Sequence, residues 1–438
     1  MAARLLLLIL AHWAISLSAC EPHAAKDSAA APCRGCNLVL ISLDTLGADH
    51  VGAYGYPRRT TPRIDALAKR SVLFEDAISQ SAWTRPSHTS MLTGLYPSEH
   101  GIVRVHDNVI VPPEAPTLAS VLRENGYATA GFTGGANMSP HFGLNRGFDV
   151  YEVKSKHMSA NVAPALRWID DEASEPFFLF LHGFEPHRPY RASARDREAF
   201  GAGSPEELQR LCESNEPPDD REPYVGVYDA AIRAGDRVVG RFLDGLKKRG
   251  LLDRTIVIFT SDHGEEIFQH GGCYHVKTLY GEILRVPFLV SVPSVDARRV
   301  AGPVPASVAT APTALELLGV ERGGIAGPSL APTILRGEPP STPLVVSETE
   351  SVEHGLVRSV TGAHQKLIHW VSGDRREFFD LAADPEEQAP LRDDDRGVTL
   401  SAALDDWTAS HPPIAAPVRA KPLPWRLQKK LIELGYVE

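Results

Sequence analysis

Four polar residues of this sequence are of types that bind metal ions or attack esters. Asp44 follows one apolar run, Asp262 and His263 follow another, and Thr84 stands two residues before Pro86. A proline favours the first turn of a helix, where backbone N–H groups stabilise a phosphate or sulfate oxyanion. Taken singly, an aspartate after a strand is more often a cap or turn former, and a threonine there is an ordinary helix cap. Their combination is what suggests a metal site beside a hydroxyl group.

Continuous apolar runs predict the strands that position these side chains. The runs span residues 37–43, 72–78, 128–132, 177–181 and 255–260, with helix-like segments between them at 61–70, 117–125, 161–172 and 228–248. Such runs are typical of strands that are buried on both faces, and their alternation with helices predicts an α/β fold. We expect a mainly parallel central sheet with helices on both faces. In such folds functional residues gather beyond the carboxyl ends of the strands, where Asp44 and Asp262 lie.

The pattern of apolar runs changes near Pro343. Residues 37–340 are expected to form the large domain, and short runs such as PLVVSE, GLVRSV, KLIHWV and REFFDL follow it. These runs predict a small C-terminal antiparallel α+β subdomain at 341–412. A Pro-rich, basic tail at 413–438 completes the chain.

The first residues predict export. Residues 1–20 combine Arg4, an apolar run and small residues before Cys20, as in a signal peptide, and the run is too short to span a bilayer. The ending LSAC resembles the lipobox of bacterial lipoproteins, which predicts a lipid anchor at Cys20 in the periplasm or at the cell surface. Ordinary cleavage nearby is the alternative. The Ala-rich segment 21–36 is suited to a tether.

Composition excludes some partners. The chain has 438 residues, of which 43% are hydrophobic, and its net charge of −10 is spread without long blocks, so nothing points to a nucleic acid partner. Four cysteines follow Cys20, namely Cys33, Cys36, Cys212 and Cys273. The single C-x-x-C lacks the second pair that a zinc site needs. Disulfides are the default in an oxidising compartment, with their pairing open.

A series of motifs follows the tether in a fixed order. They are LISLDTLGADHVGAYGY, TTPRIDALA, residues 83–97, FLHGFEPHRPY, TSDHGE, YGEILRVP and FFDLAADPEEQ. This series resembles the sulfatase family of the alkaline phosphatase-like superfamily, over nearly all of the chain after the tether. The resemblance implies the alkaline phosphatase-like fold and one divalent metal ion.

Carried over residue by residue, the resemblance implies roles for particular side chains. Asp44, Asp262 and His263 fall on metal-ligand positions, and Thr84 falls on the nucleophile and completes the ligand set. His187 and His275 match positions that contact the transferred group or protonate the leaving oxygen. The candidate substrate-binding residues are His88, His182 and Lys277.

The departures from the family pattern concern the nucleophile. A typical sulfatase has Cys or Ser there and Arg four residues later, a signature that is oxidised to formylglycine. Here the two positions are Thr84 and His88. Because threonine cannot give the same aldehyde, we expect no formylglycine. A metal-bound threonine hydroxyl is instead the device of enzymes that cleave phosphate esters, and mixed oxygen and nitrogen ligands favour zinc or manganese, with calcium also compatible.

The expected function is hydrolysis of phosphate or sulfate esters of a small molecule, glycan or lipid outside the cytoplasm. Thr84 would attack phosphorus, and a protonated His187 or His275 would assist the leaving group. Two alternatives stay open, a transferase of phospho-alcohol groups to an envelope glycan and an inactive glycan-binding protein. The sequence leaves open the ester, the acceptor, the metal, a second ion and the oligomeric state.

Overall fold

The computed structural model describes residues 32–105, 107–153, 157–391 and 395–433. The predicted signal peptide, the predicted anchor at Cys20 and most of the predicted tether lie outside the described residues. Of the helices in the described part, none combines the length and the apolar character that crossing a membrane requires.

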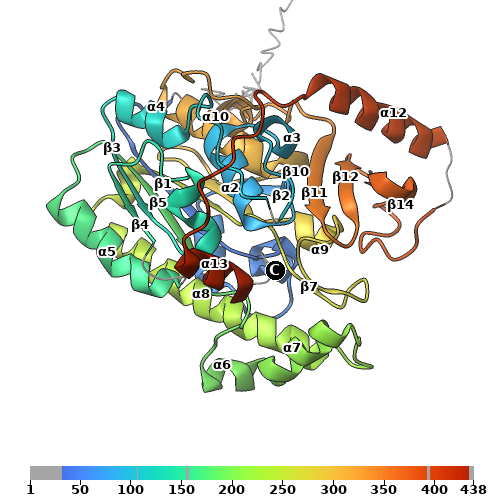
Figure 1. The fold of residues 1–438 in the computed structure, drawn as a ribbon. Coiled ribbons are helices and arrows are strands. Elements are labelled where there is room, and N and C mark those ends of the chain that lie inside the picture. The colour runs from blue at the N-terminus through green and yellow to red at the C-terminus, as the bar shows by residue number, and fades with distance from the viewer. Residues whose placement is uncertain (1–31, 106, 154–156, 392–394, 434–438) are drawn as a thin grey trace, which may run out of the picture.

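An eight-stranded sheet forms the centre of the large domain (Figure 1). In spatial order its strands are β10 (Arg298–Pro305), β2 (Val72–Ile78), β9 (Phe288–Ser291), β6 (Thr255–Thr260), β1 (Asn37–Leu43), β5 (Phe177–Gly183), β3 (Ala128–Phe132) and β4 (Val150–Glu152). All neighbouring pairs are parallel except those of β9, which runs antiparallel to both β2 and β6. The predicted mainly parallel sheet is therefore present.

Helices cover both faces of this sheet because its strands bury alternate residues on opposite sides. Leu38 and Leu40 of β1 belong to one hydrophobic core, whereas Val39, Ile41 and Leu43 belong to the other. The first core is completed by α2 (Thr84–Thr93), α4 (Leu118–Glu124), α10 (Ala306–Leu318) and α11 (Ala331–Arg336). The second is completed by α1 (Pro62–Ala68), α5 (Met158–Asp171), α7 (Pro205–Ser214) and α8 (Glu222–Lys248).

Several shorter elements connect the main helices and strands. They are α3 (Pro97–His100), α6 (Ala194–Ala199), α9 (Gly281–Leu284) and the two-stranded sheet of β7 (Glu266–Ile267) and β8 (Cys273–Tyr274). One disulfide, Cys33–Cys36, precedes β1, and a second, Cys212–Cys273, joins α7 to β8. The second disulfide ties α7 to the segment that leads into His275.

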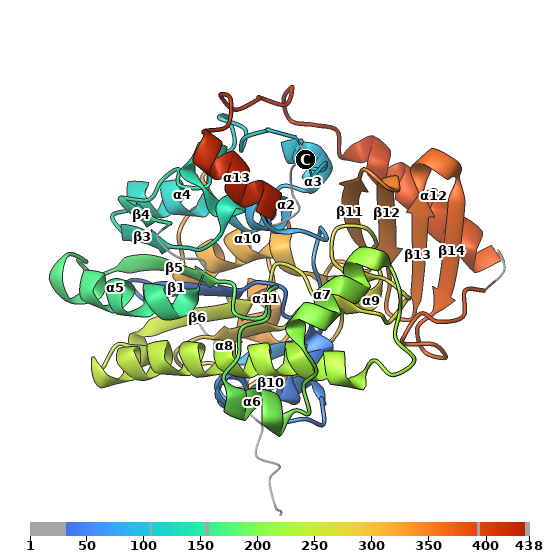
Figure 2. The ribbon, with the colours of Figure 1, turned by 60° about the horizontal axis from the view of Figure 1, so that its bottom comes forward.

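A second sheet forms the C-terminal subdomain, which stands beside the large domain (Figure 2). Its antiparallel strands are β11 (Val345–Ser351), β12 (Gly355–Thr361), β13 (Gln365–Trp370) and β14 (Arg375–Asp380), and α12 (Asp395–Ser410) packs on them. The tail contains α13 (Trp425–Glu433), whose Leu431 is buried in the first core of the large domain.

Candidate active site

Three ligand-type side chains meet at the carboxyl edge of the sheet. Asp44 directly follows β1, and Asp262 and His263 follow β6, its parallel neighbour. Because β1 pairs with β6, these two segments lie side by side although they are far apart in the sequence. All three side chains are fully buried, and His263 Nε2 lies 3.4 Å from Asp262 Oδ2 and 4.0 Å from Asp44 Oδ1.

Only some polar atoms of this cluster form hydrogen bonds within the protein. Asp262 Oδ1 accepts hydrogen bonds from the backbone N–H groups of His263 (3.0 Å) and Thr45 (3.2 Å), and His263 Nδ1 donates to the Gly264 carbonyl at 2.9 Å. Three buried atoms are left without a hydrogen bond: Asp44 Oδ1, Asp262 Oδ2 and His263 Nε2. Buried polar atoms are rarely left unpaired, and a ligating histidine commonly donates its other nitrogen to a carbonyl. The cluster therefore fits one divalent cation.

The electrostatics of the cluster agree with this fit. Burial, and then the charge of Asp262, raise the pKa of Asp44 well above its usual range. Burial opposes a charge on His263, but Asp262 and Asp44 outweigh it and raise the pKa of that imidazole. Two carboxylates thus compete for positive charge in a site without water contact, which is the environment that favours a bound cation.

Thr84 adjoins the cluster. It is the first residue of α2, and Trp83 before it has extended backbone. The Thr84 hydroxyl donates to Asp44 Oδ2 at 3.4 Å. The predicted nucleophile and a predicted ligand are therefore in contact.

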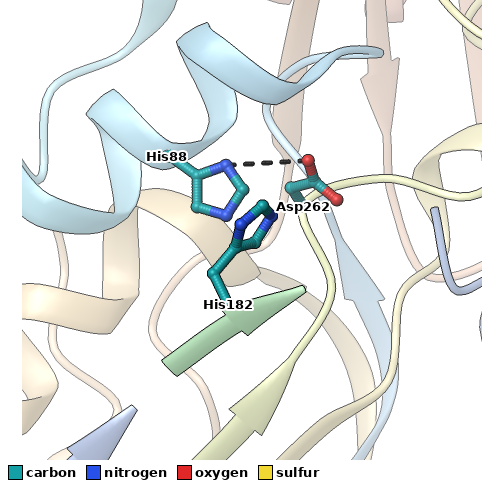
Figure 3. Close-up of side chains that lie close together, drawn as sticks. All are labelled: His88, His182 and Asp262. Carbon is teal, nitrogen blue, oxygen red and sulfur yellow. Dashed lines mark ion pairs between the residues drawn. The ribbon is translucent and has the colours of Figure 1, made fainter. Parts of the chain in front are cut away.

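His88 and His182 form a second group with Asp262 (Figure 3), since His88 Nδ1 lies 3.6 Å from Asp262 Oδ2. Burial lowers the pKa of His88 to about 3 and that of His182 to about 4, so both imidazoles are neutral. His88 Nδ1 lies 2.8 Å from the Thr84 carbonyl and therefore donates to it, and its Nε2 lies 3.0 Å from Ser42 Oγ. Both nitrogens of His88 are therefore used within the protein.

The tautomer of His182 is fixed by its neighbours. Its Nδ1 accepts from the Gly134 N–H at 3.3 Å, so the ring proton sits on Nε2 and points at Asp44 Oδ2, also 3.3 Å away. A nitrogen that carries a proton offers no lone pair to a metal ion. His182 thus orients Asp44, and His88 contacts the first turn of α2. Contact of either with substrate stays a prediction.

His187 and His275 lie next to the metal cluster. The His275 ring centroid is 4.3 Å from that of His263 and 5.2 Å from that of His187. Burial lowers the pKa of His187 to about 3 and that of His275 well below its usual value. Both imidazoles are therefore neutral without substrate, and protonation of either one during the reaction stays a prediction.

Sequence reasoning missed the group that surrounds His275. Its Nδ1 lies 2.7 Å from Glu265 Oε1, and the Tyr190 hydroxyl donates to Glu265 Oε2 at 3.1 Å. Burial raises the pKa of Glu265, and nearby positive groups including Arg188 only partly oppose this rise. Burial, and then the charges of His263 and Arg188, lower the pKa of His275. The signal was present, because Arg188 and Tyr190 stand in the same motif as His187.

Lys277 lies farther out. Its side chain is half exposed, and its ammonium pairs with Glu353 at 2.8 Å. Among the described residues it forms no ion pair with the metal cluster. A substrate contact of Lys277 stays a prediction.

Two aspartates of α8, Asp229 and Asp236, are fully buried outside the metal cluster. Asp229 accepts from Tyr56 and pairs with His50 and Arg58, whereas Asp236 accepts from two backbone N–H groups at the start of α1. Neither lies in a group that could hold a metal among the described residues. They join α8 to the chain that follows β1.

The sheet order, the flanking helices and the buried ligand cluster at the strand ends define an enzyme of the alkaline phosphatase-like fold. The sequence model of the sulfatase family matches residues 36–320, so the chain belongs to the sulfatase family. It is a sulfatase-family ester hydrolase, and the family generally uses a divalent metal ion.

Known proteins of this family are similar along most of their length. The Delta 4,5-hexuronate-2-O-sulfatase of Bacteroides thetaiotaomicron is 26% identical, with 85% of this chain and 88% of that protein covered. The ulvan-active sulfatase of Formosa agariphila is also 26% identical, over 91% and 81%.

Solved structures share the fold. A structure in complex with its substrate D-glucosamine-2-N,6-O-disulfate matches with a TM-score of 0.73 at 20% identity, over 86% of this chain and 98% of that chain. The phosphonate monoester hydrolase of Agrobacterium radiobacter matches with a TM-score of 0.72 at 19% identity, over 86% and 96%. Both sulfur and phosphorus esters are thus substrates named for proteins of this fold.

Proposed function

We propose that this protein is a metal-dependent hydrolase of phosphate or sulfate esters in which Thr84, and no formylglycine, is the nucleophile. The observation that carries the proposal is the convergence of three unpaired ligand atoms, those of Asp44, Asp262 and His263, beside the Thr84 hydroxyl. Phosphate esters are the favoured substrates, because the nucleophile is an unmodified hydroxyl, as in enzymes that cleave phosphate esters, and not the formylglycine of typical sulfatases.

The residues of the site have separate parts in this reaction. Asp44, Asp262 and His263, with Thr84, would hold one divalent ion, and the mixed ligand set favours zinc or manganese. When bound, such an ion lowers the pKa of a neighbouring hydroxyl and neutralises charge on ester oxygens. Asp44 Oδ2 is in position to accept the Thr84 proton. This contact orients the hydroxyl and supplies the base.

On the leaving-group side, His275 is held by Glu265 at 2.7 Å. A carboxylate on Nδ1 stabilises the imidazolium that forms when the other nitrogen takes up a proton. The negative charge of a bound ester would raise the pKa of His275, so that the ring takes up a proton from solvent as substrate binds. The protonated ring could then give this proton to the leaving oxygen and, once neutral again, activate a water molecule. His187, in ring contact with His275, is the second candidate for this role.

The substrate is proposed to be an ester on a glycan. Two similar proteins are named for sulfatase activity on hexuronate and on ulvan. The predicted signal peptide and lipobox support an exported lipoprotein, of which Cys20 would hold the enzyme near envelope or extracellular glycans.

The proposal is tested by turnover of an aryl phosphate, an aryl phosphodiester and an aryl sulfate with added zinc, manganese or calcium. Thr84→Ala should lower phosphoester turnover about 1,000-fold or more, since it removes the nucleophile. Thr84→Ser keeps a hydroxyl and should retain measurable turnover. Thr89→Ala, on the same helix but bonded only to the Arg85 carbonyl, controls for effects on folding.

Two results would contradict the proposal. Sulfate turnover that survives in Thr84→Ala would place the nucleophile elsewhere. A wild-type protein that binds a stoichiometric metal ion but turns over none of the three ester classes would support the glycan-binding alternative. Product analysis with an added alcohol separates hydrolysis from transfer.

A further inference from the structure

A cavity of about 820 Å³ lies beside α6 and α8, away from the metal cluster. Figure 2 shows the two helices packed together at the lower edge of the molecule. Five arginines line the cavity, and the only acidic residue of its lining is Asp196. The arginines are Arg58, Arg59, Arg195, Arg233 and Arg237. None of these residues belongs to the active site described above.

This concentration of positive charge runs against the balance of the chain. The protein carries a net charge of −10, yet the cavity lining combines five positive groups with one negative group. Guanidinium groups around one cavity repel one another, and that repulsion is relieved when an anion enters. A surface that serves only solubility does not need to collect five of them in a hollow.

Two of the arginines form a fixed frame. Arg237 makes a two-pronged contact with Asp196, with distances of 2.7 and 2.5 Å. Arg58 pairs with the buried Asp229 at 3.0 Å and with Glu222 at 2.7 Å. Their positions are set by these carboxylates, so the walls of the cavity are built before any ligand arrives.

The other three arginines have donors to offer. Arg233 Nη1 is buried, forms an ion pair with Asp236 at 3.6 Å and makes no hydrogen bond. Arg59 and Arg195 are exposed, and within the described part of the chain neither forms a hydrogen bond or an ion pair. Guanidinium groups bind sulfate and phosphate in two-pronged fashion.

The cavity is connected to the active site through the chain. Ser193, which lines the cavity, follows Tyr190 by three residues, so their Cα atoms are at most about 11 Å apart. Tyr190 in turn donates to Glu265, the partner of His275. An oligosaccharide is long enough to reach from one site to the other.

We propose that this arginine-lined cavity is a second anion site, which binds a sulfate or phosphate group on a polyanionic saccharide while another group of the same molecule lies at the metal cluster. The proposal rests on the proposed function, because it assumes an ester at the metal cluster. A cavity of this volume takes up part of a chain molecule, whereas the flat surface of a membrane could not enter it.

The test compares binding of sulfated, phosphorylated and unmodified dextran oligosaccharides of equal length by calorimetry. The protein carries Thr84→Ala, so that binding is measured without turnover while the ligand side chains of Asp44, Asp262 and His263 stay in place. Replacement of both exposed arginines, Arg59→Gln with Arg195→Gln, should weaken binding of the charged oligosaccharides about tenfold. It should not alter turnover of a small aryl ester when it is made in the wild-type background.

A matched control removes the same charge at the far end of α8. Lys247→Gln with Lys248→Gln, both exposed, should leave the affinity within about twofold, since screening limits the reach of charges to about 8 Å at physiological salt. Preference for the sulfated or for the phosphorylated oligosaccharide identifies the natural group.

Three results would overturn the proposal. The first is equal affinity of the arginine variant and the parent protein, and the second is an equal loss in the lysine control, which would mean that only net charge matters. The third is binding to anionic lipid vesicles with none to the oligosaccharides. Failure of the proposed function looks different: Thr84→Ala retains ester turnover while the arginine cavity still binds.

Discussion

Two groups of the large domain each combine one histidine with two carboxylates, namely Asp44, Asp262 and His263 in the metal cluster and Glu266, His270 and Glu282 in a second group. The negative charge of the two groups is balanced in different ways. In the metal cluster, His263 Nε2, Asp44 Oδ1 and Asp262 Oδ2 are buried and make no hydrogen bond. In the second group, His270 Nδ1 pairs with Glu282 at 2.7 Å, and its Nε2 donates to the Glu387 carbonyl at 2.9 Å. A proton on His270 supplies there the positive charge that a metal ion would supply at His263.

The position of the second group explains this difference. His270 stacks on Tyr280 with ring centroids 3.6 Å apart, and Glu387, which accepts from His270, forms a buried ion pair with Lys366 of β13. The group thus joins the large domain to the C-terminal subdomain. The comparison teaches that residue types alone do not identify a metal site, and that unpaired atoms do.

The largest expected effect comes from emptying the metal cluster. Asp262→Asn should lower ester turnover about 1,000-fold and reduce bound metal from about one ion per chain to nearly none, because a neutral amide replaces a charged ligand. Elemental analysis of the dialysed protein measures this. Glu282→Gln, the matched change in the His270 group, should leave the metal content unchanged. An equal loss of bound metal in both variants would show that the two groups do not differ in metal binding.

An intermediate effect is expected for His182, which contacts the metal cluster without offering a lone pair. His182→Gln should lower turnover about 10- to 100-fold, because Asp44 loses the donor that orients it. The stoichiometry of bound metal should stay near one. Loss of half or more of the metal would show instead that His182 is a ligand and that its tautomer differs from the one assigned here.

The smallest effect concerns stability at alkaline pH. Burial works against a charge on His270, but Glu282 outweighs it and raises its pKa to about 9, above the value near 6.5 of an unfolded chain. The stability from this shift is full below pH 6.5 and is lost as pH rises through 9. Solvent access keeps it at about 1–2 kcal/mol.

Denaturant unfolding at pH 6 and pH 10 checks this expectation. His270→Gln should destabilise the protein at pH 6 and have much less effect at pH 10. Removal of the metal ion by a chelator should change the stability of the wild-type protein and of His270→Gln by the same amount. A His270→Gln variant with the same loss at both pH values would mean that packing against Tyr280, and not charge, accounts for the effect.

The central sheet was readable from the sequence because its strands are buried on both faces. The runs at 37–43, 72–78, 128–132 and 255–260 became β1, β2, β3 and β6 with the same bounds. The strand β9 was not predicted, and neither was its direction, because an apolar run does not indicate whether pairing is parallel or antiparallel. The extent of α2 was not predicted either, because it is buried along its whole length and has no apolar stripe.

The sequence by itself determined the strands, the order of motifs and the ligand types at Asp44, Asp262 and His263, because these depend on local pattern and on family resemblance. Only the tertiary structure decided which nitrogen of each histidine carries a proton. That choice is made by distant groups, such as the Gly134 N–H at His182 and the Glu387 carbonyl at His270. The arginine cavity was equally hidden, since its walls come from three separate segments whose charges meet only when α6 packs on α8.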